Sequence, residues 1–383
     1  MFLFSYQYKH AIDFLKKYDP TLYLGLTVLI YLIYFTVRNY VNIRFHKYLV
    51  MFSLFALWIL GSYFWSSRSA YAFAKLVRFL VYGVPAFLTA SIIIAPSVKR
   101  LDNFICSFLL FWGIILSITL LAYFKDPGNV STLFDTNYLV TGQTIGLGVV
   151  ILGAMLFHQE SFSIYFKRTL GLVAGIFIAV FLELHIGGRG PLFSTLVVLG
   201  GLCALKYRPQ KFLIMCLVGV AGIVVGFWLI KNIGDNHLPA SLQRIFSEDG
   251  MQSLALRIEY YQSALQCWQT YLLKGVGIGS WPDYYGLEKL DDIEWHPHNI
   301  FLEIAAETGL VGLILFIGVV VILVRKVREQ NTNKLLTILL CGIAFCFLNA
   351  IRSGDLNDNI VLFTFMGLLA GFKQKRSFQE APL

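Results

Sequence analysis

Charged residues are scarce in this chain of 383 residues: they make up 14% of it, whereas hydrophobic residues make up 57%. In soluble globular chains roughly a quarter of the residues are charged and about half are apolar. Segments in which apolar and polar residues alternate are also lacking, which argues against a membrane β-barrel. The composition therefore excludes an ordinary soluble domain and favours a helical membrane protein.

Paired cysteines and a cleavable signal are missing as well. No two cysteines form a C-x-x-C pair, and all but Cys267 lie in apolar segments, where a free cysteine packs as a small hydrophobe. The N-terminal apolar stretch lacks the basic start and the small-residue cleavage site of a signal peptide. Neither a disulfide framework nor a cysteine metal site is indicated by the cysteine positions, which are Cys106, Cys203, Cys216, Cys267, Cys341 and Cys346.

Long apolar runs recur along the whole chain. A helix needs about 20 mostly apolar residues to cross the hydrocarbon of a bilayer. Runs of this kind predict spans near residues 20–37, 45–64, 76–95, 102–124, 142–158, 167–187, 190–206, 211–231, 298–325, 334–351 and 356–372. We therefore expect an all-α polytopic membrane protein with about 11–12 transmembrane helices, forming a single integral membrane domain over residues 1–383. A long segment, residues 232–297, separates the eighth and ninth spans.

The net charge of +9 is distributed in a way that argues against nucleic-acid binding. Basic residues gather at alternate turns between spans, as the positive-inside rule predicts for cytoplasmic loops. The rule places the segment 232–297, Arg189 and the turn around Asp355 on the outer face. Counting the crossings back from these loops places the N-terminus outside as well, although its lysines favour the cytoplasmic side. Residues 1–17 therefore form an in-plane amphipathic helix, or one crossing is miscounted. The basic groups are Lys206, Arg208 and Lys211; Arg325, Lys326, Arg328 and Lys334; and Lys373, Lys375 and Arg376.

Two arginines on the predicted outer face are candidates for an anion site. Arg189 stands between two glycines at the junction of two spans, where a charge costs up to about 3 kcal/mol if it lies at the membrane centre and less at the interface. Arg257 lies one turn from Tyr261 on a predicted helix at about 253–273. Each arginine is either an interfacial or solvated charge, or a guanidinium that forks onto phosphate oxygens.

The predicted helix at about 253–273 is amphipathic, and a glycine-rich stretch follows it. The stripe formed by Leu254, Ile258, Tyr261, Leu265, Trp268 and Leu272 has helical spacing, so the helix lies along the membrane surface or packs on the bundle. The stretch 272–286 has glycines at alternate positions but lacks the lysine and serine of a phosphate loop. We interpret it as a turn whose candidate sugar-stacking rings are Trp281, Tyr284 and Tyr285.

The segment "HPHN" at 296–299 opens the ninth predicted span. Pro297 suits the first helical position, which places His296 near the N-cap and His298 and Asn299 in the first turn. The N-terminus of a helix favours an anion and a neutral histidine. His298 is an interfacial structural residue, a metal ligand together with His296 and an acid, or a general base.

Acidic residues near this span raise further alternatives. Glu303 and Glu307 follow Asn299 at intervals of one turn, and as buried carboxylates they need partners, for which an arginine or the histidine could serve. The later turn "RSGDLNDN" gathers Arg352, Asp355 and Asp358 in a structural ion-pair cluster or a functional one. Asp291 and Asp292 indicate either a solvated acidic loop or a divalent-metal site, and Glu294 lies beside them.

These motifs, in this order, resemble the O-antigen ligase and polymerase superfamily, the WaaL and Wzy proteins. The resemblance rests on the glycine-flanked Arg189, on "LRIEYYQSALQ" with "GVGIG", and on "HPHNIFLEIAAETGLVG", and it covers roughly residues 185–315. It implies a GT-C-type membrane glycosyltransferase of the bacterial inner membrane, without metal or cofactor. Its implied donor is a glycan on undecaprenyl pyrophosphate, used at the periplasmic face.

The resemblance also implies residue roles and partners. Arg189 and Arg257 would bind the pyrophosphate and His298 would activate the acceptor hydroxyl, with inversion at the anomeric carbon. Two arginines and a neutral histidine are chemically suited to these roles. The supporting or substrate-binding residues would be Asn299, Glu303, His296, Tyr261, Trp281, Asp355 and Arg352.

Three functions stay open at this stage. A polymerase, which the turn "SGDLNDN" favours by resemblance, would use a lipid-linked glycan as acceptor and a Wzz-like chain-length regulator as partner. A ligase would use lipid A-core. A lipid-linked glycan flippase would need a polar path through the bundle, but the polar residues gather at one face, which favours an enzyme.

Overall fold

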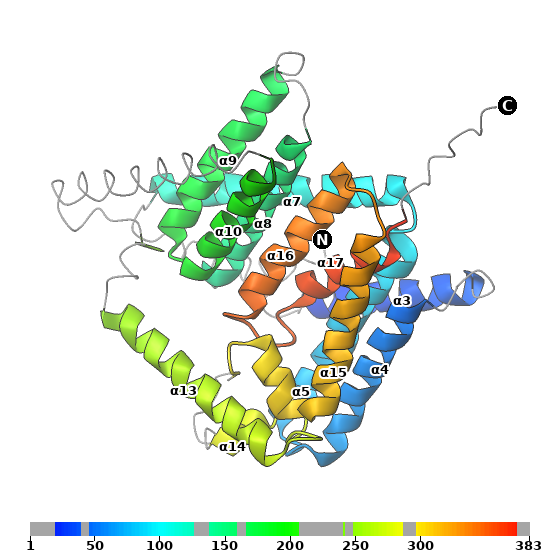
Figure 1. The fold of residues 1–383 in the computed structure, drawn as a ribbon. Helices are drawn as coiled ribbons and strands as arrows, with labels where there is room; N and C mark the ends of the chain where they lie inside the picture. The colour runs from blue at the N-terminus through cyan, green and yellow to red at the C-terminus, as the bar shows by residue number, and fades with distance from the viewer. Residues whose placement is uncertain are drawn as a thin grey trace. The chain divides into compact units, whose positions relative to one another are not determined.

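The computed structural model describes residues 20–39, 46–125, 138–158, 166–206, 240–241, 248–285 and 296–373. The regular structure in these ranges is helical, with no strand among them (Figure 1). The described chain falls into two compact units. Unit 1 holds residues 1–21, 108–261 and 340–353, and unit 2 holds residues 22–107, 262–339 and 354–383. Each unit is considered by itself.

The helices confirm a multi-pass membrane protein. In the described ranges, 7 helices are long and apolar enough to cross a bilayer, and shorter apolar helices lie at Gly171–Ile186, Lys334–Ala350 and Ile360–Gly371. Every predicted span that falls within the described residues coincides with one of these helices. The span predicted at 211–231 lies outside the described residues, as do residues 1–17, Arg208, Lys211, Asp291, Asp292 and Glu294.

Unit 1 is built around α8 (Tyr138–Phe157), which packs on α9 (Phe166–Ile186) and α10 (Arg189–Lys206). Part of α7 (Val98–Lys125) belongs to this unit too, and its Trp112 donates an indole N–H to the Ile145 carbonyl of α8 at 3.0 Å. The glycine at position 148 makes this approach possible, because a Cβ there would collide with the Trp112 ring. The other unit 1 elements are the end of α16 (Lys334–Ala350) and the first part of α13 (Glu248–Thr270).

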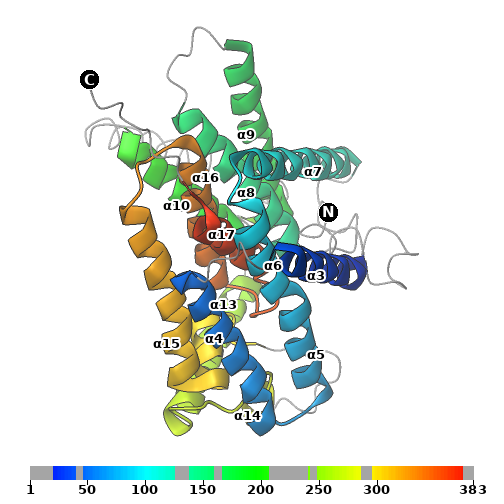
Figure 2. The same ribbon diagram turned by 90° about the vertical axis from the view of Figure 1, so that its right-hand side faces the viewer.

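Unit 2 is held together by aromatic side chains on four helices. Figure 2 shows α4 (Lys47–Ser62) beside α15 (Ile300–Arg328), and α17 (Ile360–Gly371) against α6 (Val84–Thr89). Phe52 stacks on Phe87 with ring centroids 3.8 Å apart, and Phe363 meets Phe52 edge-on at 6.0 Å. These rings are fully or almost fully buried, and each buried aromatic side chain contributes a large apolar area to stability.

The long helix that includes α6 contains two wide turns, one on each side of α6. It starts as α5 (Ala70–Arg78), and π-helical segments at Phe79–Gly83 and Ala90–Ile94 flank α6. Pro85 follows the first of these segments. Proline has no backbone N–H and its ring clashes with the carbonyl four residues earlier, so a wider turn relieves the clash. With these two wide turns, one apolar helix long enough to cross a bilayer continues from Ala70 to Ile94, where the sequence predicted a span at 76–95.

Helix α15 is broken inside its apolar length, at Gly309 (φ 69°, ψ −168°). The break deprives the carbonyls of Ala306, Glu307 and Thr308 of their helical partners. Other groups of unit 2 replace them: Val276 N–H donates to Ala306 at 3.0 Å, Gly277 N–H to Glu307 at 2.8 Å, and the Trp58 indole to Thr308 at 2.8 Å. Backbone groups in a membrane must be satisfied inside the protein, and here two backbone N–H groups and the Trp58 indole satisfy the three carbonyls.

The loop that fills the break is the glycine-rich stretch after α13, which the sequence predicted as a turn. The N–H groups of Leu310 and Val311, beyond the break, donate to the carbonyls of Leu272 and Leu273 at 2.8 and 3.4 Å. Gly275 has φ 67°, and a Cβ there would collide with the Glu307 backbone. The alternate glycines therefore allow a backbone-to-backbone contact with α15.

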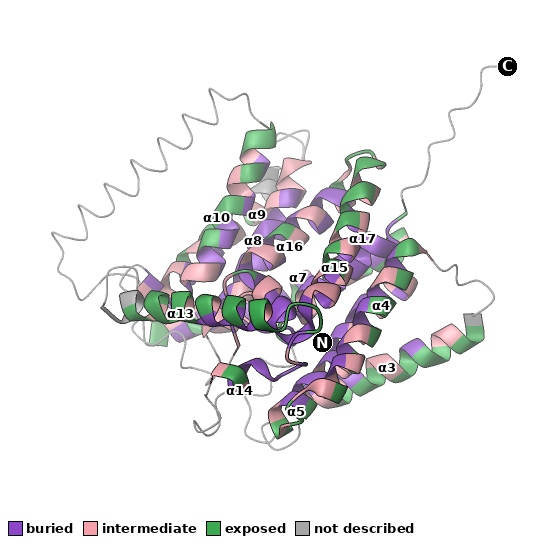
Figure 3. Ribbon diagram, turned by 60° about the horizontal axis from the view of Figure 1, so that its bottom comes forward, coloured by how far each residue is buried: buried purple, intermediate pink, exposed green. Residues whose placement is uncertain are grey.

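Helix α13 (Glu248–Thr270) occupies the predicted amphipathic range. Its predicted apolar stripe faces outward: Leu254 is 53% exposed and Ile258 is 49% exposed. Figure 3 shows exposed residues along this helix. The position of this helix, along the membrane surface or packed on the bundle, stays a prediction.

Candidate functional site

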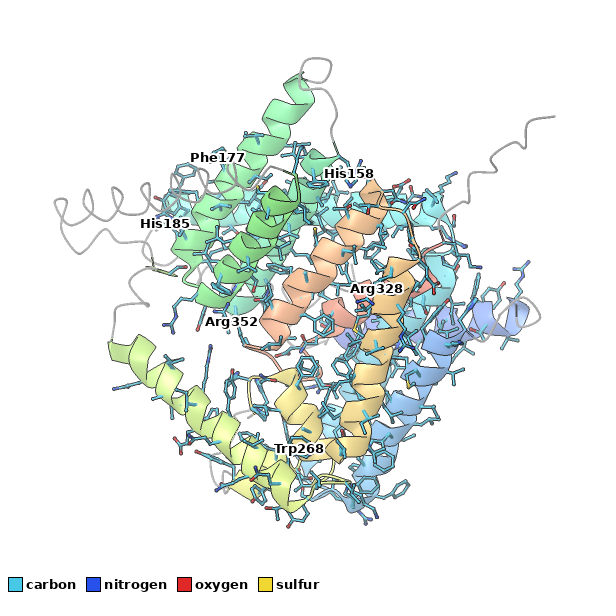
Figure 4. All side chains as sticks on the ribbon, viewed as in Figure 1. His158, Phe177, His185, Trp268, Arg328 and Arg352 are labelled. Atoms are coloured by element: carbon cyan, nitrogen blue, oxygen red, sulfur yellow. The ribbon has the colours of Figure 1, made fainter. Side chains whose placement is uncertain are left out.

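Three arginines from separate elements of unit 1 form a group in which the charges of Arg257 and Arg189 act on Arg352. We call Arg189, Arg257 and Arg352 the arginine cluster. Arg189 is the first residue of α10, Arg257 lies in α13, and Arg352 follows α16. Figure 4 labels Arg352 beside the ends of α10 and α16.

Two hydrogen bonds join the elements that carry these arginines. The Arg352 guanidinium donates from Nη1 to the carbonyl of Gly190, next to Arg189, at 3.3 Å. The Tyr261 hydroxyl, one helical turn from Arg257, donates to the carbonyl of Ile351 at 3.4 Å. The end of α16 is thereby tied both to the start of α10 and to α13.

Charges of the cluster act on Arg352 and on the neighbouring Tyr261. Burial lowers the pKa of the Arg352 guanidinium, and the positive charge of Arg257 lowers it further; Tyr261 opposes the shift and Arg189 adds to it. Burial raises the pKa of the Tyr261 hydroxyl, and the charges of Arg257 and Arg352 partly offset this. Cations that destabilise one another in a half-buried place favour binding of an anion.

The histidine segment belongs to unit 2, and the helix begins later than the sequence predicted. Asn299, not His296, is the N-cap of α15: its Oδ1 accepts the N–H groups of Phe301 at 3.0 Å and Leu302 at 3.2 Å. Pro297 and His298 therefore lie outside the helix, which corrects the prediction. Asparagine is among the best N-cap residues. The helix therefore begins after Asn299, and Pro297 does not occupy its first position.

His298 adopts a left-handed backbone conformation with φ 55°. Such a conformation is uncommon for residues other than glycine, and outliers of this kind cluster at functional sites. Its ring packs edge-on against the ring of His296, with centroids 4.3 Å apart. Both histidines are half-buried, so a substrate hydroxyl could reach them at the entrance to α15.

The carboxylates below His298 are paired with a lysine that the sequence analysis did not consider. Lys75 of α5 forms salt bridges to Glu303 and Glu307, and its Nζ lies 2.8 Å from Oε1 and 2.9 Å from Oε2 of Glu307. All three side chains are buried. The predicted partner, an arginine or the histidine, was wrong, because the buried carboxylates pair with Lys75, which lies just before the predicted span 76–95.

The turn before α17 connects to this network. Leu356 N–H donates to Glu303 Oε1 at 3.2 Å. The Asp355 carboxylate accepts the backbone N–H groups of Asn357 at 2.7 Å and Asp358 at 2.8 Å, and it is 4% exposed. Asp355 thus builds the turn that docks on Glu303.

The aromatic candidates differ in exposure. Trp281 is completely buried and stacks on Tyr285 with centroids 5.5 Å apart, so its ring is not exposed in this structure, and its role in sugar stacking stays a prediction. Tyr284 is 40% exposed and remains accessible. The spacing of these aromatic residues in the sequence could not predict which ring is exposed, because the exposure depends on how the short helix α14 (Trp281–Tyr285) packs.

A metal role for His296 and His298 would need a third ligand. In the described ranges, no group of three or more histidine, cysteine or acidic side chains could hold a metal ion. Asp291, Asp292 and Glu294 lie outside those ranges.

The fold and these two groups of residues define a multi-pass helical membrane protein with a cationic cluster and a histidine turn on separate elements. Residues 174–317 match a family described as O-antigen ligase, Wzy_C. This match confirms the resemblance to the O-antigen ligase and polymerase superfamily. The matched segment contains Arg189, Arg257 and His298, whereas Lys75 and Arg352 lie outside it. None of the curated proteins searched matches the chain.

Proposed function

We propose that this protein transfers a glycan from an undecaprenyl-pyrophosphate-linked donor to an acceptor glycolipid at the periplasmic face of the bacterial inner membrane. The observation that carries the proposal is the arginine cluster, two members of which belong to the segment that matches the O-antigen ligase family. A pyrophosphate is the leaving group of such a donor, and guanidinium groups stabilise it without a metal ion.

The proposed reaction is a single inverting displacement. The acceptor hydroxyl oxygen forms a bond to the anomeric carbon of the donor while the bond from that carbon to the pyrophosphate oxygen breaks. His298 takes the hydroxyl proton as general base, and Arg189 and Arg257 balance the charge that develops on the pyrophosphate. Asn299 supports His298 by capping α15, and His296, Glu303 and Tyr261 support the two groups through the contacts described above.

We favour a Wzy-type polymerase, with a second lipid-linked glycan as acceptor and a Wzz-like chain-length regulator as partner. The alternative is a WaaL-type ligase, with lipid A-core as acceptor. Both use the same donor chemistry, so the arginine cluster supports both equally. Supplying purified enzyme with one donor and each acceptor in turn separates them.

A lipid-linked glycan transporter is the second candidate, and one observation favours it. The break in α15 lies inside an apolar helix beside the buried Lys75, Glu303 and Glu307, and broken helices are frequent in transporters. A transporter would move the donor without a general base, so substitution of His298 would leave its activity intact.

The test of the proposed enzyme is the His298→Asn variant. Asparagine tolerates a left-handed backbone better than alanine does, so this change removes the base with little strain. We expect an inserted, folded protein that transfers no glycan from a defined lipid-linked donor. The matched control is His296→Asn, which we expect to retain most of the activity. Normal-length glycan made by His298→Asn would overturn the assignment of the base.

A further inference from the structure

We propose that Arg352 is a direct ligand of the donor pyrophosphate, so that the anion site consists of three guanidinium groups and not two. The inference rests on the proposed function, and it gives Arg352 a role that the family match does not reach, since the match ends at residue 317. The ligand class is a diphosphate ester.

Arg352 is held in place before any ligand binds. Its guanidinium lies over the Phe193 ring, 4.5 Å from the centroid, while Nη1 donates to the Gly190 carbonyl. An arginine side chain has five N–H donors in a rigid plane. The carbonyl of Gly190 takes one of them, and the stack on Phe193 fixes the plane, which leaves donors to point at a ligand with little loss of side-chain entropy.

The surroundings of Arg352 are those of a ligand site more than of a structural clamp. A clamp between α16 and the Gly190 carbonyl needs only a neutral donor, and the neighbouring positive charges of Arg257 and Arg189 disfavour an arginine there. The largest charge effect on Arg352 comes from Arg257, and it disfavours the charged guanidinium. A diphosphate would offset the repulsion that Arg257 and Arg189 exert on Arg352.

Unit 1 contains the complete proposed anion site, because Arg189, Arg257, Arg352, Phe193 and Tyr261 all belong to it. His298 belongs to unit 2. Binding of the diphosphate and proton transfer are therefore separable in variants: those in the arginine cluster should weaken donor binding, and those at His298 should not.

The experiment measures binding of farnesyl pyrophosphate and farnesyl monophosphate to purified full-length protein in detergent, by isothermal titration calorimetry. The variants are Arg352→Gln and Arg352→Lys, with Arg189→Gln as a reference. Arg328→Gln is the matched control, because Arg328 is an exposed arginine at the end of α15. We expect Arg352→Gln to weaken pyrophosphate binding at least about tenfold, as for a lost charge-assisted hydrogen bond. Monophosphate binding should weaken less, and Arg328→Gln should bind like the wild type.

Each outcome decides the matter. Wild-type pyrophosphate binding by folded Arg352→Gln, with binding lost in Arg189→Gln, would overturn the role of Arg352 and leave the proposed function standing. Unchanged binding in both variants would contradict the pyrophosphate clamp itself. If both Arg352 variants fail to fold while Arg189→Gln folds, Arg352 is a structural clamp and the proposal is overturned.

Discussion

The Lys75 ammonium group donates hydrogen bonds to both carboxylate oxygens of Glu307, with Nζ 2.8 Å from Oε1 and 2.9 Å from Oε2. The two residues come from α5 and from the short half of α15 that precedes the break at Gly309. Lys75 also bridges to Glu303 in the same half-helix. A buried ammonium group therefore fixes the part of α15 that directly follows His298.

Removal of this lysine should destabilise the protein strongly. Lys75→Met leaves two buried carboxylates without their cation, and breaking a buried pair in this way costs about 3–5 kcal/mol. We expect a large drop in the melting temperature of the purified protein, measured by fluorescence in detergent. The triple variant Lys75→Met with Glu303→Gln and Glu307→Gln should recover much of the loss. A single variant as stable as the wild type would show that the network carries little energy.

The helix break should tolerate no side chain. At Gly309→Ala, the new Cβ collides with the Leu273 carbonyl and the residue keeps a positive φ, so we expect lower stability and a weakened contact between the loop and α15. The control is Gly113→Ala in α7, where no atom lies within 4 Å of the new Cβ. That change should be neutral or stabilising by up to about 1 kcal/mol. Equal melting temperatures for the two variants would contradict the proposed need for glycine at the break.

Arg189 and Arg257 should act as a unit. Each Arg→Lys change keeps the charge but loses the bidentate fork, so each should impair transfer strongly, and the double variant should lose less than the sum of the two in free energy. The measurement is transfer from a defined lipid-linked donor to a separate acceptor. Unchanged donor binding in both single variants, with a defect only in acceptor use, would rule out the shared pyrophosphate.

The hydroxyl of Tyr261 should stay protonated across the working range of pH. Because burial raises its pKa above the ordinary value of about 10, its hydrogen bond to Ile351 stabilises the folded state fully below that pH and is lost as pH rises through the folded pKa. Melting temperatures of the wild type and Tyr261→Phe should therefore differ by a constant amount between pH 7 and 9 and converge above pH 10. A difference that disappears below pH 9 would mean that another group titrates.

Chelation of metal ions should leave activity intact if arginines alone neutralise the leaving group. Purified enzyme should transfer glycan in EDTA at its normal rate. Activity lost in EDTA and restored by magnesium or manganese would instead support a divalent-metal site at Asp291, Asp292 and Glu294.

The positions of the membrane helices follow from the sequence alone. Apolar runs of sufficient length predicted every span in the described ranges, because the hydrocarbon thickness sets the length of a helix whatever it packs against. Arg189 and His298 could also be identified as candidate site residues from the local sequence, since charged and titratable groups are rare in apolar segments.

Only the tertiary structure decided which side chains meet. Lys75 lies just before the predicted span 76–95, and only the structure shows that it is buried against Glu303 and Glu307, since burial depends on the neighbouring helix. Arg352 is separated from Gly190 by 162 positions in the sequence, yet its guanidinium donates to the Gly190 carbonyl. The glycines after α13 allow their loop to contact the backbone of α15 at its break, and no local pattern of the sequence indicates this contact. The spacing of apolar residues along one segment predicts a helix. Contacts between segments depend on how the helices pack, and the local sequence of each segment does not show this.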